Sequence, residues 1–437
     1  MNHSIKNQQD ILDKLQIKAL NPMQEEAVQV IPHTANTILL SPTGTGKTLA
    51  FLLPLLKTLR PDIKEIQALI VVPSRELAIQ IEQVLRTMGT GYKVNAVYGG
   101  RAVAKDKVEL QHTPAILVGT PGRILDHFYS DRFGKASIKT LVLDEFDKSL
   151  AAGFEEEMSG IIEELPHLEK RILTSATQGV AIPSFVHLTD PKIIDYLLEQ
   201  KESQLSLQTV TSPTGDKLPT LLALLKHIGN EPGIIFCNLK DSIAQVSAFL
   251  NEHGIAHECF YGGLEQKDRE RSLIKFRNGT CRLLIATDLA ARGIDIPELH
   301  YIIHLELPIH EEEFIHRNGR TARVQAKGTA YVLKAKNEHV PSFIKESTPI
   351  VLTAAHTLTA PYWETLFISG GRKDKISKGD IAGLFFKQGG LQKEELGVIE
   401  LKTDCAFVAV PLKLAHGLVK RLNNSRLKHK KIRITVL

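Results

Sequence analysis

The chain has 437 residues, of which 43% are hydrophobic and 24% charged, and its formal net charge at pH 7 is +5. This composition is typical of a globular protein with two or three domains and excludes fibrous and largely disordered proteins. It has no apolar run long enough to span a bilayer and no N-terminal signal segment, so we expect a cytoplasmic protein without a membrane partner. The four cysteines are widely spaced, which is typical of reduced thiols rather than of disulfides or metal ligands.

The first predicted strand leads into a glycine-rich segment. An apolar run at 37–40 precedes Ser-Pro-Thr-Gly-Thr-Gly-Lys-Thr at 41–48, and a helix-like run follows at 49–53. Glycines let backbone N–H groups close on phosphates, and a helix N-terminus adds a positive dipole end. We therefore interpret the segment as a nucleoside triphosphate site rather than a flexible turn, although Ser41 stands where the strict P-loop pattern has glycine. Its candidate ligands are Thr43, Gly44, Thr45, Gly46, Lys47, which would reach the terminal phosphates, and Thr48, which would help to hold Mg²⁺.

Strands and helices alternate through the first half of the chain. Apolar, β-branched runs recur at 68–72, 115–118, 141–143 and 171–173, with helical patterns such as 75–86 and 154–165 between them. This alternation predicts a parallel sheet covered by helices on both faces.

An acidic cluster, Asp144-Glu145-Phe146-Asp147, follows the third of these strands directly. Ligands of open α/β sheets bind at the carboxyl ends of the strands, so these carboxylates are expected to face the phosphate loop. Asp144 is the candidate Mg²⁺ ligand, and Glu145 is the candidate base that orients or deprotonates the attacking water. The alternative is a solvated acidic turn, which the preceding phosphate loop makes less attractive.

A second set of apolar runs begins after residue 205, at 233–236, 256–261, 282–285, 301–303 and 329–332. It predicts a second parallel-sheet domain without a phosphate loop of its own. The Ser-, Thr-, Pro- and Gly-containing stretch 209–217 is interpreted as the hinge between the two. We expect domains at 1–204 and 205–346, a linker at 347–361, and a tail domain at 362–437.

Within the second set, the segment 316–323 is predicted to be helical. His316, Arg320 and Arg323 would then share one face, and the two arginines are candidate arginine fingers for a γ-phosphate. The alternative is surface pairing with the acidic residues 311–313, which would contribute little.

These motifs, in this order, resemble those of the DEAD-box RNA helicases of superfamily 2. The resemblance covers roughly residues 15–335 and is carried by the segments 21–24, 41–48, 73–78, 99–100, 120–123, 144–147, 175–177, 266–269, 286–295 and 316–323. Phe146 departs from the alanine of the family name, and no aromatic residue upstream of Gln24 matches the family's adenine-stacking side chain. The resemblance implies two RecA-like domains and ATP as the nucleotide.

The resemblance also implies roles for individual residues. Gln24 would read adenine and Asp295 would touch the ribose, while Ser175 and Thr177, with His316, would couple hydrolysis to strand separation. One RNA strand would be held by its sugar-phosphate backbone, without sequence preference. Its contacts would be Arg75, Gly100, Thr120 and Arg123 in the first domain and Gln266, Arg269, Thr287 and Asp288 in the second.

The tail is strongly basic. Residues 361–437 contain 15 Lys and Arg against 7 Asp and Glu, a net charge of +8, which suggests contact with nucleic acid. Strand patterns at 365–371, 405–410 and 431–437 and helical patterns at 381–386 and 412–423 fit the β-α-β-β-α-β order of an RNA-recognition motif. Phe367 and Phe407 are candidates for base stacking, with core packing as the alternative, and Cys405 occupies an aromatic position of the motif.

The tail also resembles the C-terminal domain of bacterial DbpA-type helicases of ribosome assembly. By that resemblance it would tether the helicase to structured ribosomal RNA, with ribosomal precursor particles as partners of a monomeric protein. The candidate contacts are Arg372, Lys373, Lys375, Arg426, Lys428, Lys430 and Lys431.

The sequence thus predicts an ATP-dependent RNA helicase that opens RNA locally. Two alternatives remain open. One is a DNA-directed helicase of the same superfamily, which DNA-dependent rather than RNA-dependent ATPase activity would identify. The other is an RNA clamp that binds ATP without useful turnover.

Overall fold

The computed structural model describes residues 7–151, 153–177, 181–197, 205–288, 299–321, 328–345, 347–353 and 356–437. The chain forms two compact units, which divide between β7 (Lys192–Asp195) and β8 (Leu205–Ser212). Among the described helices, none has the length and apolar character needed to cross a membrane.

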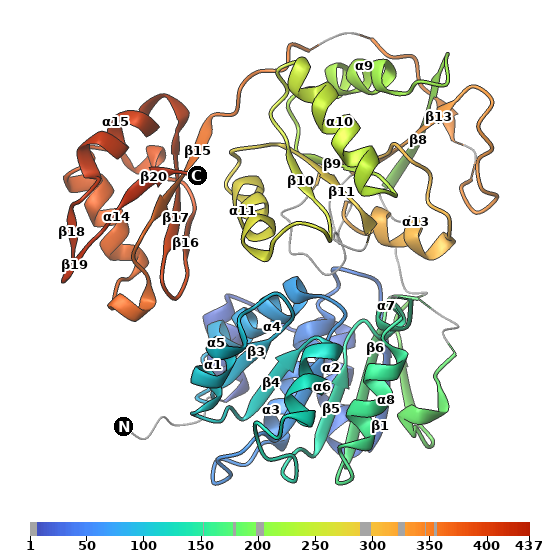
Figure 1. Ribbon diagram of the computed structural model, residues 1–437. Helices are drawn as coiled ribbons and strands as arrows, with labels where there is room; N and C mark the ends of the chain where they lie inside the picture. The colour runs from blue at the N-terminus through green and yellow to red at the C-terminus, as the bar shows by residue number, and fades with distance from the viewer. Residues whose placement is uncertain are drawn as a thin grey trace. The chain divides into compact units, whose positions relative to one another are not determined.

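The first unit is built on a parallel seven-stranded sheet with the order β3-β4-β2-β5-β6-β1-β7 (Figure 1). Besides β7, its strands are β1 (Asn36–Leu40), β2 (Ala68–Val71), β3 (Val94–Val97), β4 (Ile116–Gly119), β5 (Thr140–Leu143) and β6 (Lys170–Ser175). Its helices are α1 (Gln8–Leu15), α2 (Pro22–Val30), α3 (Lys47–Thr58), α4 (Arg75–Met88), α5 (Val103–Leu110), α6 (Pro121–Tyr129), α7 (Phe146–Ala151) and α8 (Glu155–Glu163), with short 3₁₀ turns at Ile31–His33 and Ser184–Val186.

The two faces of this sheet carry separate apolar cores. Ile70 of β2 packs in one cluster with α2, α3 and α4, whereas Leu69 and Val71 pack in the other with α6 and α8. Successive residues of a strand point to opposite faces, so central strands covered on both sides are apolar throughout. This explains why the predicted strands appeared as unbroken apolar runs.

The second unit contains another parallel seven-stranded sheet, in the order β10-β11-β9-β12-β13-β8-β14. Besides β8, its strands are β9 (Gly233–Phe236), β10 (Glu258–Phe260), β11 (Leu283–Ala286), β12 (Tyr301–His304), β13 (Gly328–Ala335) and β14 (Thr348–Pro349). Its described helices are α9 (Leu218–Ile228), α10 (Lys240–Glu252), α11 (Gln266–Arg277) and α13 (Glu311–Asn318).

The structure places strand residues inside two segments that were interpreted as a hinge and a linker. The predicted hinge 209–217 begins inside β8, because Thr209, Val210 and Thr211 are β-branched and pair along β13 despite the turn-forming residues that follow. The predicted linker 347–361 likewise contains β14, which pairs with β8 at the edge of the sheet.

The tail forms a four-stranded antiparallel sheet in the order β16-β17-β15-β20, with α14 and α15 packed on one face (Figure 1). The elements are β15 (Trp363–Ile368), α14 (Lys378–Lys387), β16 (Ile399–Leu401), β17 (Ala406–Pro411), α15 (Leu412–Leu422) and β20 (Ile434–Val436), with a hairpin of β18 (Arg426–Leu427) and β19 (Lys430–Lys431) and 3₁₀ turns at Arg372–Asp374 and Lys393–Glu395. Two parallel α/β sheets followed by a small β-α-β-β-α-β domain confirm the predicted fold class.

The tail sheet contacts the end of α11 within the second unit. The Arg277 guanidinium donates two hydrogen bonds, of 2.7 and 3.0 Å, to the carboxylate of Glu400 on β16. The Thr365 hydroxyl on β15 is completely buried between Asn278, whose Nδ2 lies 3.2 Å away, and the Thr280 hydroxyl at 2.6 Å. This face of the tail sheet is therefore partly covered.

Candidate active site

The phosphate loop joins β1 to α3. Gly44 and Gly46 have φ of +85° and +89°, a left-handed conformation that favours glycine. The Ser41 hydroxyl lies 2.7 Å from that of Thr45, which donates to the Pro42 carbonyl at 2.8 Å, so the serine that departs from the P-loop pattern braces the loop. Helix α3 begins without a side-chain cap, and its first N–H groups suit a phosphate ligand.

Lys47 lies buried at the start of α3. Its Nζ donates to the carbonyls of Ser41 and Pro42, the latter at 2.8 Å. Burial lowers the pKa of Lys47 to about 8, although the negative charge of Glu145 acts in the other direction and raises it. A polyphosphate would stabilise the charged form, as expected of the lysine of a triphosphate site.

Gln24 is tied to the same loop. Asn21 and Gln24 form a capping box at the start of α2, with hydrogen bonds of 2.9 and 3.1 Å between side chains and backbone. The Gln24 amide then donates to the Gly46 carbonyl at 3.2 Å, and Asn21 Nδ2 donates to the Thr45 carbonyl at 2.9 Å. The residue predicted to read adenine therefore contacts the phosphate loop, and Asn21 is a loop contact that the sequence prediction missed.

Asp144 and Glu145 lie at the carboxyl end of β5, as predicted, and both are buried. The Thr174 hydroxyl on β6 donates to Asp144 Oδ1 at 2.5 Å and accepts the Glu145 N–H at 3.0 Å. Glu145 has φ of +51°, a strained conformation for a residue with a side chain. Its carboxylate lies 2.5 Å from Lys148 Nζ, which is fully buried on α7.

The sequence prediction missed Thr174 and Lys148. Lys148 stands three residues after Glu145 at helical spacing, and this signal could have identified it. No pattern in the sequence links Thr174 to Asp144, because their contact depends on the pairing of β5 with β6. Phe146, the departure from the family name, is 2% exposed and packs in the apolar core beneath the site.

The carboxylates suit a divalent cation. Burial, reinforced by the charge of Glu145, raises the pKa of Asp144 to about 6, so a positive charge close to Asp144 would stabilise its ionised form. Magnesium usually takes one or two carboxylates and completes its shell with water and substrate phosphates. Among the described residues there is no cluster of three or more His, Cys, Asp or Glu side chains that could hold a metal ion.

The predicted coupling motif is linked to both halves of the site. The Thr177 hydroxyl donates to Asp147 Oδ2 at 3.0 Å, and the Ser175 hydroxyl accepts the Thr177 N–H at the same distance. The Ser41 N–H donates to the Ser175 carbonyl at 3.1 Å. Movement of the phosphate loop or the acidic cluster would therefore reach this motif directly.

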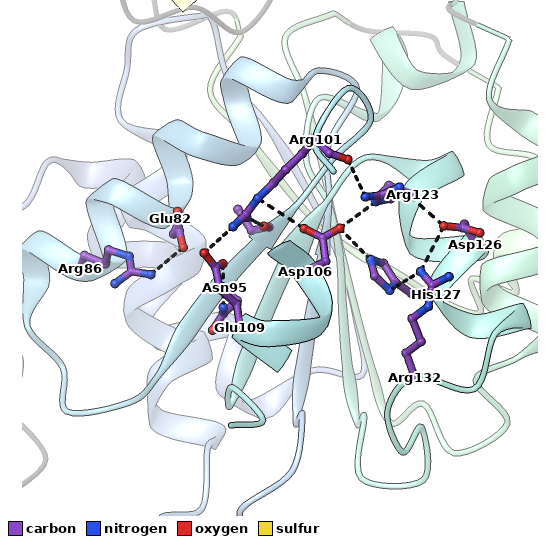
Figure 2. A network of polar contacts seen from close by, with 11 residues as sticks. Glu82, Arg86, Asn95, Arg101, Asp106, Glu109, Arg123, Asp126, His127 and Arg132 are labelled. Carbon is purple, nitrogen blue, oxygen red and sulfur yellow. Dashed lines mark hydrogen bonds and ion pairs between the residues drawn. The ribbon is translucent and has the colours of Figure 1, made fainter. Parts of the chain in front are cut away.

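The four RNA candidates of the first unit are brought together on neighbouring turns. Gly100 has φ of +79°, and a Cβ added there would lie 2.5 Å from the Arg75 guanidinium. The Thr120 N–H donates to the Val97 carbonyl, which ties the start of α6 to the strand before the Gly99-Gly100 turn. Arg123 is held by Asp106 and by the Arg101 carbonyl, each at 2.8 Å (Figure 2).

In the second unit, Gln266 and Arg269 occupy the first turn of α11, where the Arg269 guanidinium lies 4.9 Å from the centre of the Phe260 ring. Thr287 follows β11, and its N–H donates to the Phe260 carbonyl. The Asp288 carboxylate accepts two hydrogen bonds, of 2.7 and 2.5 Å, from Arg317, which is 1% exposed. Sequence reasoning gave Arg317 no role, yet it fixes Asp288.

The helix predicted over 316–323 is shorter than expected. Helix α13 ends at Asn318, with Gly319 at its C-cap, so Arg320 lies beyond the helix rather than one turn from the buried His316. Beyond the helix, Thr321 pairs with Leu299 in an isolated β-bridge, so the chain has left the helical path there. Arg320 is 5% exposed. Arg323 and Asp295 lie outside the described residues.

The tail presents both paired and exposed basic residues. Arg372, Lys373 and Lys375 are exposed at the turn after β15. Arg426 and Lys431 are exposed on the hairpin. Lys428 and Lys430 instead form ion pairs with Asp380 and Asp374, at 2.9 and 2.7 Å.

The two aromatic candidates for base stacking, Phe367 and Phe407, contact each other edge to face across β15 and β17, with ring centres 5.7 Å apart. Phe407 is 6% exposed, and its burial favours the packing interpretation for this residue.

Comparison with known proteins gives three family matches. Residues 21–183 match the DEAD/DEAH box helicase model, residues 216–325 the helicase conserved C-terminal domain, and residues 365–436 the DbpA RNA binding domain. The chain is 33% identical to the ATP-dependent RNA helicase DbpA of Escherichia coli, over 98% of this chain and 96% of the relative, and 29% identical to DbpA of Bacillus subtilis, over 94% and 93%. A solved structure of Saccharomyces cerevisiae Dbp5 bound to RNA and ADP BeF3 aligns with a TM-score of 0.70 at 25% identity, over 78% of this chain and 93% of that one.

Proposed function

Because the chain belongs to the DEAD-box ATP-dependent RNA helicases of the DbpA type, we propose that it opens short duplexes in structured RNA, and that its target is ribosomal RNA in assembling ribosomal particles. The observation that carries the proposal is the convergence of Lys47, Asp144 and Glu145 at one edge of a sheet, together with a tail that matches an RNA-binding domain.

The hydrolytic roles follow from the local chemistry. Lys47 binds the terminal phosphates of ATP, and Gln24 selects the adenine from its place beside the loop. Glu145 positions the attacking water and accepts its proton. Asp144 and Thr48 would hold Mg²⁺, which neutralises phosphate charge when bound.

The second unit supplies the remaining charge. We assign Arg320 and Arg323 to the γ-phosphate, in line with the resemblance to the helicase family, and burial of Arg320 beside α13 supports a fixed guanidinium. RNA held along Arg75, Gly100, Thr120 and Arg123 and along Gln266, Arg269, Thr287 and Asp288 would then complete an active arrangement. Turnover is thus made dependent on RNA.

Unwinding would be local. Separating one step of duplex costs about 1.4 kcal/mol by the DNA value. One ATP-driven closure can therefore offset a few base-pair steps but not a long helix. The basic tail would supply target choice, because the core contacts of the RNA backbone carry no sequence information.

The test is ATP hydrolysis by the full chain with three polymers: a ribosomal RNA fragment, an unrelated RNA and single-stranded DNA. We expect strong stimulation by RNA and none by DNA. Removal of residues 361–437 should abolish the preference for ribosomal RNA while leaving stimulation by unrelated RNA. Stimulation by DNA would favour the DNA-directed alternative.

Glu145→Gln is the matched variant for chemistry. It should retain ATP and RNA binding while hydrolysis falls at least about 100-fold, as for loss of a general base. Wild-type protein that binds RNA and ATP without turnover would instead indicate the clamp.

A further inference from the structure

Asp106 is a carboxylate completely buried in the first unit, on the short helix α5 between the Gly99-Gly100 turn and α6. The family resemblance gave it no role. Figure 2 shows it at the centre of a polar network between α5 and α6. A buried carboxylate that keeps its charge requires partners, and those partners identify what it does.

The Asp106 carboxylate binds one candidate RNA contact, Arg123, and two residues that flank such contacts, Arg101 and His127. Its Oδ2 accepts from Arg123 Nε at 2.8 Å and lies 3.1 Å from His127 Nε2. Its Oδ1 lies 3.4 Å from Arg101 Nε. Burial alone would raise the pKa of Asp106, but the hydrogen bonds from His127 and Arg123 and the charges of the two arginines hold it below the ordinary value.

The orientation of His127 follows from its other neighbour. Arg132 Nη1 lies 3.1 Å from His127 Nδ1. A guanidinium can only donate, so Nδ1 is the acceptor and the ring hydrogen is on Nε2. His127 therefore donates to Asp106, and the carboxylate faces a donor on each side.

The network reaches the Gly99-Gly100 turn through Arg123. Its Nη2 donates to the carbonyl of Arg101, directly after the turn, at 2.8 Å. The Arg101 side chain is itself held, because Nη1 donates to the Ala96 carbonyl at 3.0 Å and Nη2 pairs with Glu109. On the other side of the turn, the Arg75 guanidinium packs against Gly100.

We propose that Asp106 is the positioning residue of the RNA surface on the first unit: it fixes the Arg123 guanidinium and the adjacent glycine turn in the arrangement that receives the phosphates of one strand. The hydrogen bonds of Arg123 use its Nε and one donor on Nη2. Its Nη1 lies 3.7 Å from the half-exposed Asp126 carboxylate, beyond hydrogen-bond distance, so the Nη1 donors and the second Nη2 donor suit a phosphate. This inference rests on the proposed RNA helicase function and adds a residue that does not touch RNA itself.

The test uses the full chain and a single-stranded oligoribonucleotide, with affinity measured by fluorescence anisotropy over a series of KCl concentrations. Asp106→Asn keeps the volume but places an amide donor against existing donors, so Arg123 loses its anchor. We expect the Kd for RNA to rise about tenfold. The slope of log K against log salt should fall by about 0.7, the value for one lost phosphate contact on a single strand.

Glu82→Gln is the matched control, because it also removes a carboxylate paired with an arginine, Arg86 on α4, in the same unit. It should bind RNA as the wild type does. Arg123→Gln should reproduce the Asp106→Asn defect, and the double variant should be no weaker than the weaker single variant. Additive losses, or an unchanged salt slope in Asp106→Asn, would overturn the proposal.

Folding and function are separated by two further measurements. If Asp106→Asn melts before RNA can be added, Arg123→Lys takes its place, because it keeps the charge but not the forked anchoring. We then expect a folded protein with a somewhat lower melting temperature and weaker RNA binding at temperatures well below it, and wild-type affinity would refute the positioning role. Wild-type protein without RNA-dependent ATPase activity would count against the helicase function instead, whatever the variants do.

Discussion

Asp144 and Glu145 lie close together in a buried site, and at neutral pH their burial and mutual repulsion destabilise the folded protein relative to the unfolded chain. The pKa of Asp144 is raised to about 6 by burial and by Glu145, whereas an aspartate in an unfolded chain has a pKa of about 3.9. Between these values the folded state binds more protons than the unfolded one, so the free energy of unfolding falls as the pH rises. Ionisation of Asp144 therefore lowers the free energy of unfolding of the protein.

This predicts a pH-dependent gain in Asp144→Asn. The variant removes the titration while keeping an oxygen for Thr174, so its melting temperature relative to wild type should increase between pH 4.5 and pH 7.5, by about 2–5 °C. The measurement is thermal unfolding without nucleotide at both pH values. Asp13→Asn, an exposed carboxylate on α1, is the control. A difference that is constant or shrinks as the pH rises would show that Asp144 does not titrate in this window.

At the scale of elements, the start of α2 combines two tasks in Asn21: its Oδ1 caps the helix and its Nδ2 holds the phosphate loop at Thr45. Asn21→Asp retains the cap acceptor but loses the donor. We expect it to melt as the wild type does while its KM for ATP rises about fivefold, the equivalent of one hydrogen bond of about 1 kcal/mol.

Asn21→Ala removes both the helix cap and the hydrogen bond to Thr45, so its free energy of unfolding should also fall by about 1 kcal/mol. Steady-state ATPase assays and thermal unfolding of the two variants separate the effects. An unchanged KM in Asn21→Asp would mean that the link to Thr45 does not matter for nucleotide binding.

The sequence was most informative where function depends on neighbours in the chain. The spacing of Gly44, Gly46 and Lys47 predicts the phosphate loop, and an acidic pair after an apolar run predicts the carboxyl end of β5. Contacts between distant segments could not be found in this way. The bridge from Thr174 to Asp144 and Glu145 exists only because β5 and β6 are adjacent in the sheet.

The errors have the same origin at the level of elements. Helical spacing continued through 316–323, but the structure ends α13 at Asn318, and Thr321 pairs with Leu299 in an isolated β-bridge instead. The turn-forming residues of 209–217 masked the strand preference of β8, which its pairing with β13 supports. The placement of Arg320, the domain boundaries and the RNA contacts remain predictions.

At the scale of the whole molecule, positive charge is concentrated in the tail. Among the described residues of the second unit, Arg277 on α11 and Glu400 on the tail sheet form an ion pair, with side chains 25% and 17% exposed. Reversal of Glu400 would place two positive charges together, and reversal of Arg277 would place two carboxylates together, although Glu400 also lies 3.8 Å from Lys402 Nζ. Such a pair is suited to a charge-swap experiment.

We expect Arg277→Glu to weaken this contact by about 2 kcal/mol, the scale of a hydrogen bond to a charged group. Adding Glu400→Arg should restore much of it. Hydrogen–deuterium exchange of the full chain is the measurement, with faster exchange expected at β15 and at the end of α11 in the single variant. Reversal of the exposed Lys393 serves as the control. Exchange as slow as in the wild type would mean that the pair does not hold the tail.

The left-handed backbone of Glu145 has a consequence for engineering. Glycine adopts such a conformation without the steric penalty of about 1–2 kcal/mol that a side chain incurs. Replacement by glycine would relieve this penalty, but it would also remove the carboxylate that pairs with the buried Lys148. Breaking a buried ion pair usually costs about 3–5 kcal/mol, more than the backbone strain, so a selection for heat resistance alone should keep the acidic side chain at this position.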